Sequence, residues 1–287
     1  MYVRQHIASY MKQTNNTIEI ASKGLYSSWC YHKPSRTLFD CGEGVASYQG
    51  NYLYGVERIC LSHGHDDHIL GLPLFISIRN CACGERDKPL EIYYPADDWM
   101  IQTLIRYLKA IHRNNMRFEI QWKPIKAGDQ IYLNDKQKIV AFEMIHSSSP
   151  TLGYKIIETR RKLKPEYRGQ NISELLKSGV VQKENLHVEY DGNIFAYTLD
   201  SYFFESEHIS GCELLVADCT FINNEDRTDK THYSLTETYE KAKQASVQHL
   251  VAAHFSSRYL FPDIKNAIEK LDTSFITPVY HNTVSCC

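Results

Sequence analysis

The sequence predicts an α/β fold, and two observations support that prediction. Short runs of β-branched and aromatic residues alternate with segments whose apolar residues recur at helical spacing over the 287 residues. Several of the apolar runs also end directly at a His or an Asp, the position where sheet proteins place chemistry because loops open a cleft there. A chain of this length can bury a sizeable core, and we treat residues 1–287 as one domain.

Strands are expected wherever a short run is rich in β-branched or aromatic residues and is bounded by turn residues. In chain order these runs cover residues 17–21, 27–32, 36–40, 58–63, 90–95, 117–125, 138–146, 152–158, 194–199, 213–218 and 248–254.

Helices are expected over residues 67–80, 97–113, 234–245 and 262–271, where apolar residues follow helical spacing. Asp97 is the expected N-cap of the second helix, and Ser234 with Glu237 forms a capping box for the third. Residues 159–193 are polar and begin with a basic run, so we expect a protruding segment there. It is either a solvated surface excursion or an element that contacts substrate or a second subunit.

Composition narrows the class of protein. The apolar fraction of 43% and the charged fraction of 23% are ordinary for a soluble globular protein. No apolar run approaches the roughly 20 residues that span a bilayer, and the first residues lack a signal peptide, so we expect a cytoplasmic protein. The net charge of −2 gives no global attraction to polyanions.

The nine cysteines do not form a disulfide framework in a chain of this length. The two closest pairs, Cys81 with Cys83 and Cys286 with Cys287, could be metal or redox devices. Free thiols are the preferred interpretation, because no second pair has the spacing of a zinc ribbon.

Five expected strands end at residues that can bind metals: His63, His146, Asp200, Asp218 and His254. A single His at a strand end is usually a structural residue with its own hydrogen-bond partner. Five such ends in one chain are hard to explain that way, because buried carboxylates are costly unless they are paired or bind a metal.

The motif H-x-H-x-D-H follows the fourth expected strand and comprises His63, His65, Asp67 and His68. Such a group has too many ligands for one tetrahedral ion, so it predicts two ions. Imidazole and carboxylate without thiolate suit zinc first, and manganese or iron next. The competing interpretation is a chance cluster of surface histidines.

The motif resembles that of the metallo-β-lactamase superfamily, and further segments resemble the branch that contains tRNase Z. These segments are LFDCGEGV (38–45), HSSSPTLGY (146–154), YTLDS (197–201), VADCTF (216–221), KTHYSLTETYEKAKQA (230–245) and LVAAHFSSRY (250–259). The resemblance implies an αββα sandwich: two mixed sheets packed face to face, helices on both outer sides, and metal ions at one rim.

The same resemblance implies roles for nine residues. His63, His65 and His146 would hold one metal ion, and Asp67, His68 and His254 would hold the other. Asp200 would bridge the two ions. His232 would be the general acid, positioned by Asp218, where the family has Glu, so this contact departs from the family pattern. Relatives of this kind are dimers, which predicts a homodimer here.

Three departures from the tRNase Z pattern predict a small phosphodiester as substrate. Residues 175–193 lack the Gly-Pro element of the tRNA-gripping arm and leave no room for a long arm. The glycine-rich N-terminal segment is replaced, and the net charge is slightly acidic, whereas proteins that neutralise many phosphates are basic. The chain most resembles the anti-Pycsar phosphodiesterases, which implies hydrolysis of 3′,5′-cyclic mononucleotides to nucleoside monophosphates and a disfavoured role for tRNA.

Three alternatives remain open: a ribonuclease Z-like endonuclease that processes tRNA 3′ ends, another hydrolysis on the same fold, and an inactive binding protein. Arg79 and Asn80 could contact phosphate or could form an ordinary helix end. Five aromatic residues could stack on a base or could pack in the core: Trp29, Tyr31, Tyr154, Phe255 and Tyr259.

Overall fold

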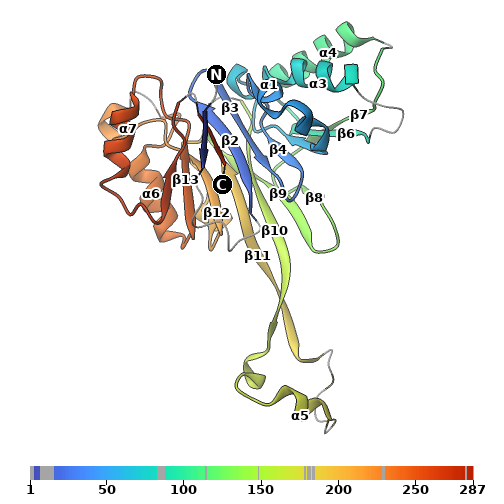
Figure 1. The fold of residues 1–287 in the computed structure, drawn as a ribbon, viewed down its shortest axis with the longest axis vertical. Helices are drawn as coiled ribbons and strands as arrows, with labels where there is room; N and C mark the ends of the chain where they lie inside the picture. The colour runs from blue at the N-terminus through green and yellow to red at the C-terminus, as the bar shows by residue number, and fades with distance from the viewer. Residues whose placement is uncertain are drawn as a thin grey trace.

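The computed structural model describes residues 3–6, 16–82, 88–113, 115–147, 149–177, 179, 182, 185–227, 230–281 and 283–286. Within these residues the chain forms two β-sheets that pack face to face, with helices on both outer sides (Figure 1). This arrangement confirms the predicted α/β class and the αββα sandwich.

The first sheet has eight strands and is mixed. Its order is β1 (Val3–His6), β15 (Thr283–Cys286), β2 (Ile18–Lys23), β3 (Ser27–His32), β4 (Thr37–Phe39), β5 (Arg58–Cys60), β6 (Leu90–Pro95) and β7 (Ile120–Ile125). The pairs from β4 to β7 are parallel, so the carboxyl ends of these strands lie at one edge of the sheet.

The second sheet has seven strands and is also mixed. Its order is β14 (Ile276–Pro278), β13 (His249–Ala253), β12 (Leu214–Asp218), β11 (His187–Thr198), β10 (Thr151–Leu163), β9 (Gln137–Met144) and β8 (Gln130–Tyr132). Strands β11 to β14 pair in parallel, which again brings their carboxyl ends to one edge.

Apolar side chains from both sheets fill the space between them. Phe39 of β4 lies against Tyr154 of β10 and Phe195 of β11, with ring centroids 5.8 and 5.1 Å apart. All three side chains are fully buried. Burial of side chains this large stabilises the fold by roughly 1.5–3 kcal/mol each, so this layer holds the two sheets, and the strand ends above them, in a fixed relation.

The outer faces of the sheets are covered by separate groups of helices (Figure 1). The first sheet carries α1 (Val45–Gln49), η1 (Gly50–Gly55), α2 (Asp66–Ile69), α3 (Leu72–Ala82) and α4 (Trp99–His112). The second carries η4 (Ser206–Ile209), η5 (Asn224–Asp226), α6 (Leu235–Gln244) and α7 (Phe261–Ile268).

The helix expected over residues 67–80 is two helices, because the chain bends at Gly71 between α2 and α3. A Cβ atom at Gly71 would collide with the backbone carbonyls of Gly42 and Cys41, so only glycine permits this close approach. The bend fixes α2, which carries Asp67 and His68, directly on the sheet. The capping box of Ser234 and Glu237 is confirmed at the start of α6.

The N-cap of α4 is Asp98, and the prediction of Asp97 is wrong. Asp98 accepts hydrogen bonds from the backbone N–H groups of Met100 and Ile101, both at 3.0 Å. Asp98 is also fully buried, beside Gly64 of the histidine motif, whereas Asp97 is exposed. Two adjacent Asp residues are equally good N-cap candidates in a sequence. Here the buried one caps the helix.

Strands β10 and β11 continue beyond the sandwich as a two-stranded ribbon (Figure 1). Strand β9 pairs with β10 only as far as Glu158, and β12 pairs with β11 only from Phe195. We call residues 158–192 the arm. Its far end carries η2 (Pro165–Tyr167) and α5 (Ile172–Lys177).

The expectation that no room exists for a long arm is therefore wrong. A strand was expected only from residue 194, but β11 begins at His187, and most of its first residues are exposed. A ribbon that is exposed on both faces lacks the alternation of apolar and polar residues that marks a half-buried strand. Backbone pairing and ion pairs such as Arg161–Glu189, at 2.7 Å, hold it together instead.

Among the described residues no helix is both long and apolar enough to cross a bilayer. The cysteines whose side chains are described are free thiols: Cys30, Cys41, Cys60, Cys81, Cys212 and Cys219. Cys83 and Cys287 lie outside the described residues, so neither close cysteine pair is described as a pair.

Candidate metal centre

The strand ends that carry His and Asp meet at one rim between the two sheets. Residues that follow β5, β9, β11 and β13, together with the last residue of β12, face a common space there. The structure thus brings together all nine residues that the sequence singled out: His63, His65, Asp67, His68, His146, Asp200, Asp218, His232 and His254. Their roles as ligands and acid stay predictions.

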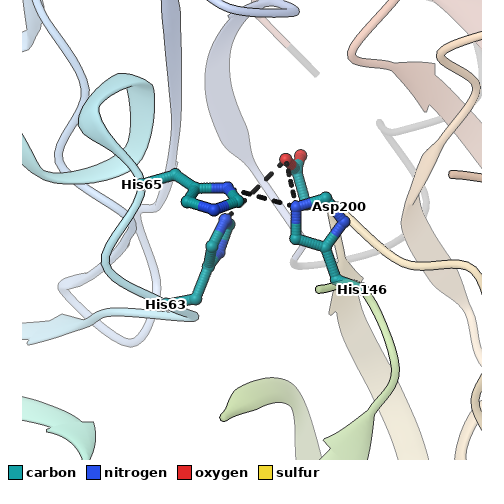
Figure 2. A group of neighbouring side chains, drawn as sticks. All are labelled: His63, His65, His146 and Asp200. Atoms are coloured by element: carbon teal, nitrogen blue, oxygen red, sulfur yellow. Dashed lines mark hydrogen bonds and ion pairs between the residues drawn. The ribbon is translucent and has the colours of Figure 1, made fainter. Parts of the chain in front are cut away.

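A first group contains His63, His65, His146 and Asp200, whose candidate ligand atoms all lie within 4.8 Å of one another (Figure 2). Nε2 of His146 lies 3.2 Å from Nδ1 of His65 and 3.6 Å from Oδ2 of Asp200. Nε2 of His63 lies 3.8 Å from the same carboxylate oxygen. Three imidazole nitrogens and one carboxylate oxygen therefore converge on one point.

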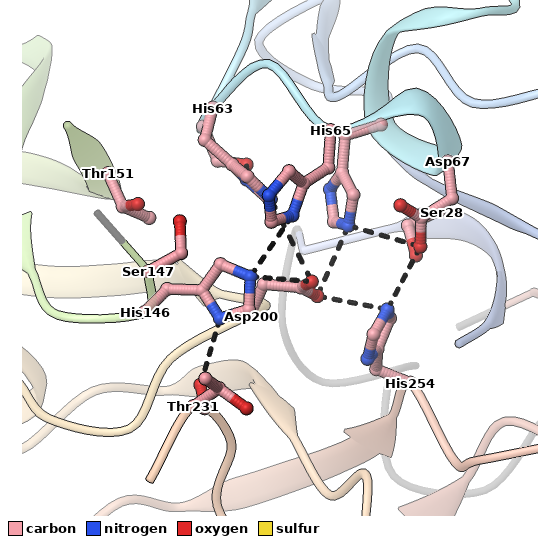
Figure 3. A network of polar contacts seen from close by, with 12 residues as sticks. Ser28, His63, His65, Asp67, His146, Ser147, Thr151, Asp200, Thr231 and His254 are labelled. Carbon is pink, nitrogen blue, oxygen red and sulfur yellow. Dashed lines mark hydrogen bonds and ion pairs between the residues drawn. The ribbon is translucent and has the colours of Figure 1, made fainter. Parts of the chain in front are cut away.

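A second group contains Asp67, His68, His254 and again Asp200. Figure 3 labels Asp67, Asp200 and His254 of this group. Here the other carboxylate oxygen takes part: Oδ1 of Asp200 lies 3.2 Å from Nε2 of His68 and 3.0 Å from Nε2 of His254. Oδ2 of Asp67 lies 3.3 Å from the same nitrogen of His254. Asp200 thus presents one oxygen to each group, which is the geometry of a bridging ligand.

The donors of both groups fit metal ions. Nε2 of His63, Nε2 of His68 and Oδ1 of Asp200 are buried and form no well-aligned hydrogen bond among the described residues, although they lie within ion-pair distance of other members of the cluster. Buried polar atoms are normally paired, and leaving one unpaired costs about 1–3 kcal/mol. Three such atoms that face the same space fit a dinuclear site of divalent cations, with nitrogen and oxygen donors and no thiolate.

The buried carboxylates of the cluster also need positive charge beside them. Burial alone would raise the pKa of Asp200, but His254 and His68 hold it well below its ordinary value. Burial would likewise lower the pKa of His254, yet Asp200 and Asp67 raise it to about 10. Without metal ions the raised pKa values of His68 and His254 favour protons on these two rings, which would balance the carboxylates, whereas burial lowers the pKa of His63 and of His146. Metal binding releases such protons, so two divalent ions would take over this charge.

Three of the residues at this rim have backbone angles in the left-handed region. The φ angles are 55° at Asp40, 55° at Asp200 and 66° at His254. This region is uncommon for residues with a side chain and persists only where the surrounding structure enforces it. The sharp turn at each strand end aims these side chains into the cluster.

Asp40 is a site residue to which the sequence interpretation gave no role. It follows β4 and is fully buried. Its Oδ2 accepts hydrogen bonds from Nδ1 of His68 at 2.7 Å, the hydroxyl of Ser62 at 2.8 Å and the hydroxyl of Tyr197 at 2.8 Å. The bond to Nδ1 fixes the tautomer of His68 and directs Nε2 to the metal space. The signal was present, since Asp40 also ends an apolar run.

Replacing Asp40 with Asn should weaken binding of one metal ion by about 10–100-fold, the usual cost of losing a group that orients a ligand. The Asn side chain keeps the shape and tolerates the left-handed backbone, but its amide accepts a hydrogen bond less strongly than a carboxylate does. Calorimetric titration of the metal-free protein with Zn²⁺ measures this change. Equal affinities in the variant and the native protein would contradict the role of Asp40.

His232 and Asp218 form a pair at the edge of the cluster. Nδ1 of His232 donates to Oδ2 of Asp218 at 2.7 Å, so the shorter Asp side chain makes the contact that the family makes with Glu. Asp218 is fully buried and also accepts hydrogen bonds from Ser201 and Thr220. Those bonds occupy its oxygens, which favours a positioning role for Asp218 over a metal ligand.

The pair controls the proton on His232. Burial would lower the pKa of His232, but the adjacent Asp218 carboxylate raises it above its ordinary value. The bond at Nδ1 leaves Nε2 directed away from Asp218. The ring centroid of His232 lies 4.6 Å from that of His146 and 5.3 Å from that of His254. An imidazole that holds its proton more firmly than a free histidine therefore stands beside both metal groups.

Arg79 and Asn80 are structural residues, and a phosphate contact by Arg79 is excluded. Arg79 is 2% exposed and donates to the backbone carbonyls of Val56 at 2.6 Å and Lys88 at 3.0 Å. Asn80 donates to the carbonyl of Asn115 and accepts from the N–H of Arg117. Both side chains tie the end of α3 to neighbouring segments.

Four of the five aromatic candidates for base stacking belong to the core. Trp29, Tyr31, Tyr154 and Phe255 are all buried, so the packing alternative is confirmed for them. Tyr259 is half-buried, and its hydroxyl donates to Asp226 at 2.7 Å. Base stacking by the four buried rings is ruled out, because a stacked base needs an open ring face.

Comparison with known proteins shows the family and the fold of this chain. Residues 35–164 match the Beta-lactamase superfamily domain. Ribonuclease Z of Methanosarcina acetivorans is 30% identical over 246 residues, which cover 77% of this chain and 78% of that protein. Ribonuclease Z of Streptomyces avermitilis is 29% identical over 246 residues, 79% of each chain. The structure of the short form of human tRNase Z has the same fold, with a TM-score of 0.65 at 16% identity over 93% of this chain and 98% of that one.

Proposed function

Because this chain belongs to the metallo-β-lactamase superfamily, in the branch that contains the ribonucleases Z, we propose that it is a dinuclear metal-dependent phosphodiesterase that processes the 3′ side of precursor tRNA. The observation that carries the proposal is the pair of donor groups that share Asp200, with the His232–Asp218 pair beside them. This combination provides both charge neutralisation and a proton donor, the two requirements of phosphodiester cleavage.

Each residue of the site has one role in the proposed reaction. His63, His65 and His146 would hold one ion, Asp67, His68 and His254 the other, and Asp200 would hold both. Two divalent ions held there, which we take to be Zn²⁺, would supply charge neutralisation for a phosphodiester and would lower the pKa of a bound water. Nε2 of His232 carries the proton for the departing oxygen, and Asp218 keeps its ring in the required tautomer.

Two observations support tRNA as the substrate. The relatives reported above are named ribonuclease Z. The arm gives this chain an extension far from the metal rim (Figure 1), and the expectation that disfavoured tRNA depended in part on the absence of such an extension. That expectation is therefore withdrawn. The homodimer implied by the resemblance stays a prediction.

Hydrolysis of 3′,5′-cyclic mononucleotides is the second candidate function, and the charge of the arm favours it. Arg160 is paired with Glu158 and with Glu213. Arg161 is paired with Glu189, and the Lys162 ammonium lies 4.8 Å from the ring centroid of Tyr190. Binding to a nucleic-acid backbone needs cations that release counterions from phosphates, and cations already paired within the arm contribute less to it.

One assay separates the two candidates. The zinc-loaded protein is incubated with a precursor tRNA that has a 3′ trailer and, separately, with the four 3′,5′-cyclic mononucleotides. We expect cleavage of the precursor at the trailer and none in EDTA. Hydrolysis of a cyclic nucleotide with an intact precursor would support the second candidate. No phosphodiester cleavage in either reaction would contradict both.

A further inference from the structure

A cavity of about 520 Å³ opens beside the first metal group. It is formed by the ends of β6, β7 and β9 and by the loop that follows His146. Ile145 and Ser147, which flank His146 in the chain, both line it. Leu152, another lining residue, donates its N–H to the carbonyl of Ser62, next to His63, at 2.9 Å. The cavity is therefore lined by the chain neighbours of His146 and by a residue bonded to the neighbour of His63, but by none of the candidate metal ligands.

The cavity lies on one side of the metal rim. Ser147 and Thr151, which belong to its lining, lie on the side of His63 and His146, while Asp67 and His254 lie on the opposite side (Figure 3). A phosphodiester has two substituents that leave the phosphorus in different directions. A substrate whose phosphate sits at the metal rim can place one substituent in this cavity.

The residues that line the cavity determine which kind of phosphodiester substituent it can hold. The accessible apolar lining comes from Ile145, which is 51% exposed, and from the exposed residues Ala127 and Pro150, whereas Met144 and Leu152 are nearly fully buried. The carboxylates of Asp97 and Glu143 also line the cavity, against one ammonium from Lys126, which pairs with Asp97 at 3.7 Å. Two carboxylates repel a further phosphate. Apolar walls with hydrogen-bond acceptors suit a flat, uncharged ring that carries N–H donors, and the volume falls within the range of small-molecule sites.

We propose that this cavity holds the base of a nucleoside esterified to the scissile phosphate, and that Glu143 favours bases with an exocyclic amino group. Adenine, cytosine and guanine carry such a group as a hydrogen-bond donor, whereas uracil does not. The site is a specificity determinant for the proposed phosphodiesterase activity and rests on that function. It applies to a polynucleotide and to a mononucleotide alike, since both present a nucleoside next to the phosphate.

Esters with a common leaving group test the proposal. The substrates are the 5′-(p-nitrophenyl phosphate) esters of adenosine and uridine, and methyl p-nitrophenyl phosphate, which has no base. Because the bond that breaks is the same in all three, differences in kcat/KM report on the base. We expect adenosine to exceed methyl by about tenfold or more, the order of a stacked base, and to exceed uridine. Equal values for all three would overturn the proposal.

Two variants of residues that line the cavity test whether the dependence of kcat/KM on the base arises there. Ala127→Trp fills the cavity from an exposed turn and should bring the adenosine-to-methyl ratio of kcat/KM toward one. Glu143→Gln should bring the adenosine-to-uridine ratio toward one, because the amide accepts and donates equally well. The matched control is Glu240→Gln on the exposed face of α6, which should leave both ratios unchanged. Ratios that persist in both lining variants would place the base elsewhere.

Binding without turnover separates this proposal from the proposed function. Calorimetry with adenosine 5′-monophosphate and with methyl phosphate measures the contribution of the base alone. We expect adenosine 5′-monophosphate to bind more tightly, and Ala127→Trp to remove the difference. An absence of ester cleavage together with this binding pattern would contradict the phosphodiesterase and leave the base site intact. Normal cleavage with equal binding of the two ligands would contradict the base site alone.

Discussion

Replacing Asp200 with Asn should lower phosphodiester turnover by about 10³-fold or more and reduce the bound metal below two ions per chain. Asp200 is the residue shared by both donor groups, with one oxygen directed to each. The amide is a weaker ligand and carries no charge, so both ions lose a donor. A bound ion stabilises the transition state by several kcal/mol, and each 1.36 kcal/mol is a factor of ten in rate.

The Asn variant changes the ligand atom at residue 200 without changing the backbone turn. Asn tolerates a positive φ, so the turn at residue 200, with φ of 55°, can keep its geometry. Asp66→Asn is the matched control, because Asp66 lies within the histidine motif but is exposed and belongs to neither donor group. Elemental analysis of both variants, with turnover measured on the same preparations, checks the prediction. Two bound ions and native turnover in Asp200→Asn would refute the bridging role.

Replacing His232 with Ala should lower cleavage of substrates with an alkoxide leaving group by about 10²–10⁴-fold, the usual contribution of a general acid. The same change should affect p-nitrophenyl esters much less, because nitrophenolate departs without a proton. Metal content should stay at two ions. His232 belongs to a third group of possible ligands, with Asp200, Asp218 and His254, but its Nδ1 is bonded to Asp218, so we expect it to act as the acid and not as a ligand.

The dependence on the leaving group distinguishes a proton donor from a structural residue. His232 is held by Asp218 at 2.7 Å and packs against the rings of His146 and His254, so its removal could also disturb the cluster. A disturbed cluster would slow both classes of substrate equally. An equal fall on the alkoxide and nitrophenyl substrates would therefore contradict the acid role of His232.

The grouping of the candidate ligands could be predicted in part from local rules. His63, His146 and His254 each follow an apolar run, and strand ends are where sheet proteins place chemistry, whereas the division of the ligands between two ions came from the resemblance. Asp40 obeys the same rule but binds His68 rather than a metal, and its partners Ser62 and Tyr197 come from other strands. A role that depends on such distant partners cannot be read from one segment.

The wrong prediction about the arm and the rejected phosphate role of Arg79 share a physical origin. A protruding segment was expected at residues 159–193, but its paired strands were missed because a largely solvent-accessible ribbon has no apolar period. Arg79 was considered for phosphate because an Arg at a helix end near a metal motif is ordinarily exposed. Here two backbone carbonyls, of Val56 and Lys88, compensate for its burial. In both cases the decisive partners are backbone groups, and the identity of a side chain carries little information about them.

The fold and the metal rim leave the substrate open, because many activities occur on one fold and recognition depends on the surfaces around the site. Two such surfaces are present. The arm extends far from the rim and would act on a long substrate, whereas the cavity beside His146 would act on the nucleoside next to the phosphate. The ratio of kcat/KM between adenosine and methyl esters tests the role of the cavity. Cleavage of precursor tRNA tests the role of the arm.

Anomalous X-ray scattering from crystals of the zinc-loaded protein, measured on either side of the zinc edge, tests the central claim most directly. We predict two zinc peaks about 3.5–4 Å apart, the spacing of two-metal hydrolytic sites. One should be bound by His63, His65 and His146, the other by Asp67, His68 and His254, with Asp200 between them. A single peak, or two peaks that do not share Asp200, would contradict a dinuclear centre at this rim.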